Sequence, residues 1–330
     1  MREFPAGHIY SCKTGLKRYY DVPSRDADVT DSEAAQKGII ERLEAAVRKR
    51  LIADVPVGVF LSGGLDSSLI AALARRHKDP LETFSVGTAD SEDRRRALEV
   101  ADVLGTRHHE RVYTIEEAAE AIPEVIYHLE SFDCALVRSA IPNFFLANLA
   151  SEHVKVALSG EGADELFAGY AYLKELDPEA LRDELLHITR SLHNTNLQRC
   201  DRMSMAHGLE VRVPFLDVAV VDYAFRIPVS LKQFGPERQE KWILRKAAES
   251  CLPHDVTWRR KSKFAAGSGL GNHMADLAER NISDAEFIRS QEIADGMFLR
   301  SKEELWYYQI FKQMYPRDDL LPLVGRSRSV

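Results

Sequence analysis

The chain has 330 residues, of which 45% are hydrophobic and 29% charged, and this composition excludes a disordered, fibrous or low-complexity protein. The formal net charge of −7 disfavours a non-specific nucleic-acid binder, so no nucleic-acid partner is expected. No apolar run approaches the roughly 20 residues that span a bilayer, and the first residues show no signal or transit peptide. We therefore expect a cytoplasmic protein with no membrane partner. The four cysteines lack CxxC or His-paired spacing, which argues against a zinc site or a disulfide framework.

Strands and helices alternate along the first half of the chain. An irregular or short-strand lead-in, residues 1–29, precedes an amphipathic helix that begins near Asp31. Short apolar runs predict buried strands at 55–61 and 154–160, and further strands are predicted at 81–87 and around 109–113. Helices are predicted after the first strand and at 93–104, 115–131 and 142–151.

This alternation predicts an α/β fold with a doubly wound parallel sheet within residues 55–160, whose ligands sit beyond the carboxyl ends of the strands. Helical apolar spacing continues over 165–320 and predicts a large C-terminal helical elaboration of the same domain, 30–330. The polar end of the chain, 325–330, is expected to be disordered.

The first chemical motif, SGGLDSS, lies between the first buried strand and the next helix. Gly63 and Gly64 let backbone N–H groups approach a ligand, the hydroxyl groups of Ser62, Ser67 and Ser68 add donors, and the helix N-terminus favours an anion. The motif therefore predicts a phosphate cradle, although it is not a Walker A loop because no lysine ends the turn. A simple helix cap is the weaker alternative.

A carboxylate inside such a cradle would repel phosphate unless a cation bridges the two groups. Asp66 occupies that position, which implies a hard divalent metal such as Mg²⁺. The second motif, SGEGADELFAGY, follows the strand at 154–160 and brings three acids to the same edge of the sheet. Glu161, Asp164 and Glu165 there predict a shared metal and a general base, with a helix cap as the structural alternative.

Two further segments carry clustered positive charge. WRRKSKF, residues 258–264, has four cations in seven residues and fits a leaving pyrophosphate, although such runs are often solvated surface. In residues 198–217, Arg199, Arg202 and Arg212 lie among apolar residues and require partners, either a ligand anion or the nearby acids.

Taken in order, VPVGVFLSGGLDSS, YHLESFD with Arg138, SGEGADELFAGY, GLEVRVPFLD and WRRKSKF resemble the synthetase domain of the glutamine-dependent asparagine synthetase family, which belongs to the ATP pyrophosphatases. The resemblance runs along nearly the whole chain. It implies that aspartate reacts with ATP through its side-chain carboxylate, that pyrophosphate leaves, and that ammonia converts the resulting β-aspartyl-AMP to asparagine and AMP.

The resemblance also implies a role for each matching residue. The pyrophosphate of ATP would lie in the SGGLDSS loop, and Asp66 and Asp164 would hold Mg²⁺. Glu161 would accept a proton from the attacking nitrogen, and Lys261 would neutralise phosphate charge. The remaining residues implied in binding adenosine or substrate are Leu61, Val86, Ser159, Gly160, Arg138, Asp164 and Arg212.

The chain departs from the family at its front. Residues 4–21 resemble the last strands of the family's glutaminase domain, and residue 2 is Arg where the family has a nucleophilic cysteine. We therefore expect free ammonia or a glutaminase domain or subunit as the nitrogen source, and a second copy of the chain is a further compatible partner. Related cyclases that close β-lactam or lasso-peptide rings, an RNA-modifying ATP pyrophosphatase and an inactive scaffold are the alternatives, of which the lasso-type cyclase is hardest to exclude from motifs.

Overall fold

A computed structural model describes residues 3–259, 267–294 and 296–327. Its centre is a five-stranded parallel sheet with the strand order β5-β4-β3-β6-β7. The strands are β3 (Val57–Phe60), β4 (Glu82–Gly87), β5 (Arg107–Val112), β6 (Val156–Leu158) and β7 (Glu210–Arg212). The chain moves outward from β3 to β5 and then returns to the other side of β3. The predicted doubly wound sheet is confirmed, and its order reverses between β3 and β6.

The sheet extends beyond the predicted range, because β7 lies in a region expected to be helical. β7 has only three residues and pairs with β6, with Val211 opposite Ala157. A segment of this length is too short to show the alternation that identifies a strand from sequence. The segment therefore becomes a strand through its hydrogen bonds to β6 and not through a sequence pattern of its own.

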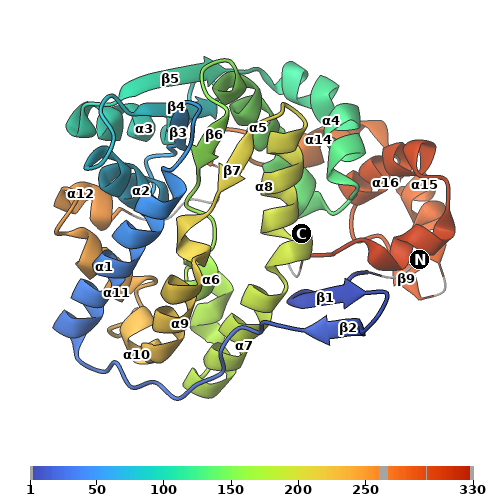
Figure 1. The fold of residues 1–330 in the computed structure, drawn as a ribbon. Coiled ribbons are helices and arrows are strands. Elements are labelled where there is room, and N and C mark those ends of the chain that lie inside the picture. Colours follow the sequence, from blue (N-terminus) through green and yellow to red (C-terminus); the bar gives the residue numbers. More distant parts are fainter. Residues whose placement is uncertain (1–2, 260–266, 295, 328–330) are drawn as a thin grey trace.

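Helices cover both faces of the sheet (Figure 1). The first half contributes α1 (Ser32–Arg50), α2 (Leu65–Arg75), α3 (Glu92–Leu104), α4 (Ile115–Leu129), α5 (Cys134–Ser151) and α6 (Ala163–Phe167). The later helices are α7 (Pro178–Arg190), α8 (Asn196–Met205), α9 (Val218–Arg226), α10 (Val229–Lys232), α11 (Trp242–Ala248), α12 (His254–Thr257), α14 (His273–Asn281), α15 (Asp284–Ser290) and α16 (Lys302–Met314). The helical C-terminal part is thus confirmed.

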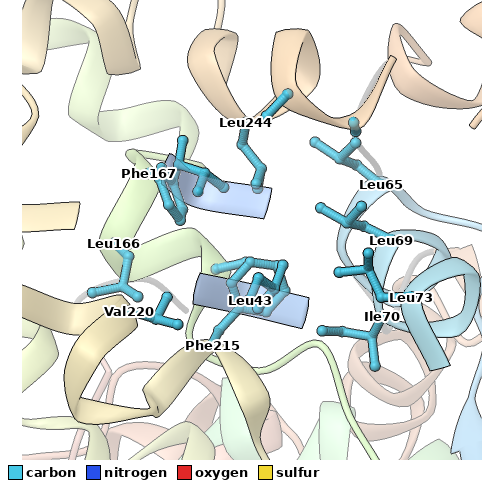
Figure 2. Close-up of a cluster of buried hydrophobic side chains, with 14 of the residues drawn as sticks. Leu43, Leu65, Leu69, Ile70, Leu73, Leu166, Phe167, Phe215, Val220 and Leu244 are labelled. Carbon is cyan, nitrogen blue, oxygen red and sulfur yellow. The ribbon is translucent and has the colours of Figure 1, made fainter. Parts of the chain in front are cut away.

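Two hydrophobic cores lie on opposite faces of the sheet. Val57 and Val59 of β3 join the core formed with α1, α2, α9 and α11, whereas Phe60 joins the core formed with α4, α5 and α16. Figure 2 shows Leu43 of α1 between the leucines of α2 and the cluster of Phe167 and Phe215. The two cores fix β3 and β6 from both sides, so the loops that follow these strands start from rigid positions.

The lead-in forms an antiparallel hairpin of β1 (His8–Ser11) and β2 (Gly15–Arg18). Ion pairs then attach the following segment to the helical part, with Asp21 bound to Arg190 at 2.6 Å and Asp28 bound to Arg226 at 2.8 Å. A second short hairpin, β8 (Glu292–Ala294) with β9 (Met297–Phe298), precedes α16.

The last described residues are anchored, and the disorder expected over 325–330 stays a prediction because residues 328–330 lie outside the described part of the chain. The backbone N–H of Ser327 donates to Asp133 at 2.8 Å, and Arg326 pairs with Glu304 at 2.7 Å. Asp133 and Glu304 are both fully buried and also bind Arg300, so the last described residues complete a buried cluster of charged side chains. The composition of GRSRSV carries no sign of these distant partners.

Candidate active site

A cavity opens at the carboxyl ends of β3 and β6, where the strand order reverses. Both chemical motifs reach it, as expected for a ligand site of a doubly wound sheet. The residues that line it are Phe60, Leu61, Ser62, Gly64, Leu65, Asp66, Ser67, Ser85, Val86, Asp93, Asn143, Leu146, Ser159, Gly160, Glu161, Asp164, Arg199, Cys200, Lys241, Arg245 and Arg259.

The SGGLDSS segment forms a loop that ends in the N-terminus of α2. Gly63 adopts a positive φ of 67°, and a Cβ there would meet the backbone carbon of Arg96 at 2.4 Å, so the turn requires glycine. The hydroxyl of Ser67 lies 3.0 Å from that of Ser62 and accepts the Ser62 N–H at 3.2 Å. These bonds hold the loop around the helix N-terminus and its unpaired N–H groups, which attract an anion.

The two motif loops touch at Gly160. A Cβ at this position would lie 2.9 Å from the backbone nitrogen of Ser67 and 3.0 Å from the backbone carbon of Asp66. Glycine is therefore needed for the loop after β6 to approach the start of α2. This close approach brings the acids of the second motif to the SGGLDSS loop.

Asp66 and Asp164 share one cation. The ammonium of Lys241 lies 2.6 Å from Oδ2 of Asp66 and 2.5 Å from Oδ1 of Asp164. Burial acts to lower the pKa of Lys241, but the charges of Asp164 and Asp66 outweigh it and raise the pKa above its ordinary value. The motifs predict the two carboxylates, whereas Lys241 lies within the helical spacing of 165–320 and no local motif marks it as part of a site.

The same carboxylates fit a divalent metal in part. Oδ1 of Asp66 is buried and has no hydrogen-bond partner, which leaves an acceptor available for a cation. Within the described residues, no group of three or more His, Cys, Asp or Glu could hold a metal. Mg²⁺ commonly completes its shell with water and substrate phosphates, so two carboxylates suffice for a site that forms with the nucleotide.

Glu161 is paired with an arginine from α8. The guanidinium of Arg199 donates to Oε1 of Glu161 and, at 3.3 Å, to Oδ1 of Asn143. Burial acts to lower the pKa of Arg199, whereas the charge of Glu161 raises it, and the net shift is upward. The pair fixes the carboxylate at the cavity wall. Of the arginines in 198–217, Arg199 is the one that lines the cavity.

Behind this pair lies a buried carboxyl that the second motif also predicted. Glu165 accepts hydrogen bonds from the hydroxyl of Tyr170 at 2.5 Å and from the amide of Asn196 at 3.1 Å. Burial, followed by the charge of Asp164, raises the pKa of Glu165 to about 7. Glu165 therefore faces the protein interior, not the cavity.

The start of the WRRKSKF segment contacts the SGGLDSS loop. Arg259 donates to the carbonyl of Gly63 at 3.0 Å and to Asp93 at 2.9 Å. Burial raises the pKa of Asp93 to about 6, and Arg259 opposes this shift. Arg245 holds the carbonyl groups of Thr257 and Arg259 at 2.7 and 2.8 Å and so orients this segment. Lys261 lies outside the described residues.

Arg138 and Arg212 are not brought to the cavity. Arg138 in α5 is bound to the buried Glu303 of α16. Arg212 in β7 binds Glu210 at 2.7 Å and donates to the carbonyl of Ile52, also at 2.7 Å. Each arginine is ion-paired with a carboxylate of the protein. For Arg212, the sequence left such pairing open as an alternative to a ligand anion. Both substrate-binding roles therefore lack support from this geometry.

The residues expected near adenosine all reach the cavity, whereas two residues of the SGGLDSS loop do not. Leu61, Val86, Ser159 and Gly160 all line the cavity, together with Phe60 and Leu146, which add an apolar wall. Gly63 and Ser68 of the first loop do not contribute to the lining in the described structure, and Ser68 is fully buried.

In the parts of the chain that are described, no helix is both long and apolar enough to cross a membrane.

Comparisons with known proteins agree with the motifs. The family model for asparagine synthase matches residues 38–184 and 175–327. The chain is 38% identical to the probable asparagine synthetase (glutamine-hydrolyzing) of Schizosaccharomyces pombe, covering 95% of this chain and 62% of that protein. It is 37% identical to asparagine synthetase (glutamine-hydrolyzing) 3 of Arabidopsis thaliana, covering 99% of this chain and 60% of that protein. The chain therefore spans about three fifths of the length of these relatives.

Proposed function

Because the chain belongs to the asparagine synthase family, we propose that it is an ATP-dependent ligase that converts aspartate and ammonia to asparagine, AMP and pyrophosphate. One observation carries this proposal. The phosphate cradle at Ser62–Ser68 and the acids Glu161 and Asp164 meet in one cavity at the reversal of the strand order. A carboxylate activated at the phosphate end can therefore react at the acidic end without leaving the cavity.

The first step joins aspartate to the nucleotide. An oxygen of the aspartate side-chain carboxylate forms a bond to the α-phosphorus of ATP, and the bond from that phosphorus to the pyrophosphate breaks. The N-terminus of α2 and the cations Lys241 and Arg259 face the negative charge that develops on the departing pyrophosphate. Mg²⁺ held by Asp66 and Asp164 would supply further positive charge to the pyrophosphate.

The second step forms the amide. The nitrogen of ammonia attacks the activated carbonyl carbon, AMP leaves with the former carboxylate oxygen, and the nitrogen loses a proton. Glu161 is the proposed acceptor of that proton, because its carboxylate lines the cavity and Arg199 holds it in a fixed position.

Several parts of the proposal rest on family resemblance alone. Lys261 is proposed to neutralise phosphate charge, and Arg138 and Arg212 are proposed to contact substrate only if their present partners release them. A glutaminase domain or subunit is the proposed source of ammonia, with free ammonia as the alternative source. A cytoplasmic location and a homodimer are likewise part of the proposal.

The test supplies the chain with MgATP, ammonium and one candidate acid at a time, and follows pyrophosphate release together with the amide product by mass spectrometry. We expect asparagine only when aspartate and ammonium are both present. Pyrophosphate release without asparagine would assign the chain to a cyclase or another amide ligase. If no acid supported pyrophosphate release, the proposed activity would be wrong for this chain.

A further inference from the structure

Lys241 joins the two motif loops at the centre of the candidate site. It lies 175 residues after Asp66 in the sequence, yet its ammonium contacts both Asp66 and Asp164. The SGGLDSS loop carries no lysine of its own. A cation from another part of the chain therefore stands beside the phosphate cradle, where other phosphate-binding loops carry a lysine within the loop.

The surrounding structure is shaped to hold this side chain. Lys241 adopts a positive φ of 55° just before α11, and its side chain is 3% exposed. A Cβ at Gly169 would lie 2.2 Å from Cε of Lys241 and 1.8 Å from Oδ1 of Asp164. The absence of a side chain at residue 169 thus leaves the space in which the lysine and the aspartate meet. A non-glycine residue with positive φ is uncommon and indicates a constrained position.

The charges around the cavity distinguish Lys241 from the other cations. The described lining has four carboxylates and four cationic side chains, so its formal charge is balanced. Arg199, Arg245 and Arg259 each pair with a single carboxylate, Glu161, Glu240 and Asp93, respectively, and Glu240 also binds Lys174. Lys241 is instead shared by one acid from each motif. Loss of the charge on Lys241 would remove the cation that Asp66 and Asp164 share.

From this geometry we propose that Lys241 is a positioning residue that makes metal binding depend on the nucleotide. In the nucleotide-free protein its ammonium occupies the place between Asp66 and Asp164 that a divalent cation would otherwise take. With ATP and metal bound together, Asp66 and Asp164 would hold the metal and the ammonium of Lys241 would turn to the triphosphate. The inference rests on the proposed function only for the identity of the nucleotide.

The test measures binding of Mn²⁺ to the nucleotide-free chain by electron paramagnetic resonance, and binding of ATP with Mg²⁺ by calorimetry. Lys241→Met should bind Mn²⁺ at least about tenfold more tightly than the unmodified chain, because a positive charge next to two carboxylates is removed. The same variant should bind MgATP about tenfold more weakly. Neither readout needs amide formation, so a failure of the proposed activity would leave this test intact.

Two variants serve as controls. Lys241→Arg keeps the charge and should bind Mn²⁺ as weakly as the unmodified chain, whereas Lys37→Met removes an exposed lysine of α1 and should change neither affinity. Circular dichroism establishes that each variant is folded. If folded Lys241→Met bound Mn²⁺ no more tightly than the unmodified chain, the proposal would be overturned. If Lys241→Met did not fold, a gain in Mn²⁺ affinity in Lys241→Arg would overturn it, and no gain would support it.

Discussion

The carboxylate of Glu161 is ion-paired with the guanidinium of Arg199, which lies 38 residues later in the chain. The pair joins the loop after β6 to α8, and both side chains line the cavity. An ion pair at this position holds the proposed proton acceptor in a fixed place at the cavity wall. The second step of the reaction should therefore depend on Glu161 much more than the first step does.

Glu161→Gln should separate the two steps. The amide keeps the shape of the side chain but cannot accept the proton, so formation of asparagine should fall by about 10²-fold or more. Pyrophosphate should still appear as a burst of roughly one equivalent per chain in rapid-quench measurements. Glu41→Gln, at an exposed position of α1, is the matched control and should keep full activity. Full activity of Glu161→Gln would remove its assignment as the proton acceptor.

Gly160→Ala should weaken ATP binding by at least about tenfold. The added Cβ would lie 2.9 Å from the backbone nitrogen of Ser67, and a backbone atom cannot move aside as a flexible side chain can. The two motif loops would have to separate. Gly105→Ala is the control: its φ of 62° makes alanine costly by about 1 kcal/mol, but nothing lies near its Cβ, so stability should fall without a loss of ATP affinity. Calorimetry measures the affinities, and equal ATP affinities of Gly160→Ala and the unmodified chain would contradict the close-approach argument.

Asp93→Asn should reduce ATP affinity in a pH-dependent way. The pKa of Asp93 is raised to about 6, so its carboxyl becomes ionised and pairs fully with Arg259 only as the pH rises through that value. At pH 7.5 the variant should bind ATP roughly fivefold more weakly than the unmodified chain, because Arg259 loses the charged partner that holds it beside Gly63. At pH 5 the two should bind alike.

Titrations of ATP binding at the two pH values provide the measurement. Asp102→Asn, at an exposed position of the same helix, should match the unmodified chain at both pH values. A loss of affinity in Asp93→Asn that was equal at pH 5 and pH 7.5 would show that the charge of Asp93 is irrelevant.

Lys232→Met should stabilise the fold. Burial lowers the pKa of Lys232 to about 7, so between that value and its ordinary pKa the unfolded chain binds a proton that the folded chain does not. The contribution of Lys232 to the free energy of unfolding is therefore lowest at and below pH 7, and it rises as the pH increases above 7. The variant should be more stable by about 3 kcal/mol at pH 7, with a smaller gain at pH 9.5. Urea unfolding at both pH values tests this, and an equal gain at the two values would contradict it.

Much of this site was predictable because its parts are local. The strand-to-loop transitions at Phe60 and Leu158 are marked by buried apolar runs that end in glycine motifs, and a parallel sheet brings such ends together. The partners of the charged residues were not predictable in the same way. The ion pairs of Arg138 with Glu303 and of Lys241 with Asp66 join residues 165 and 175 positions apart, and no local pattern encodes such contacts.

The most direct test of the central claim follows an oxygen atom. Aspartate labelled with ¹⁸O in its side-chain carboxylate is incubated with the chain, MgATP and ammonium, and the AMP formed is analysed by mass spectrometry. Adenylation of the carboxylate predicts one ¹⁸O atom in the phosphate of AMP for each asparagine made, because the carboxylate oxygen leaves with AMP. Asparagine formed together with unlabelled AMP would contradict the account.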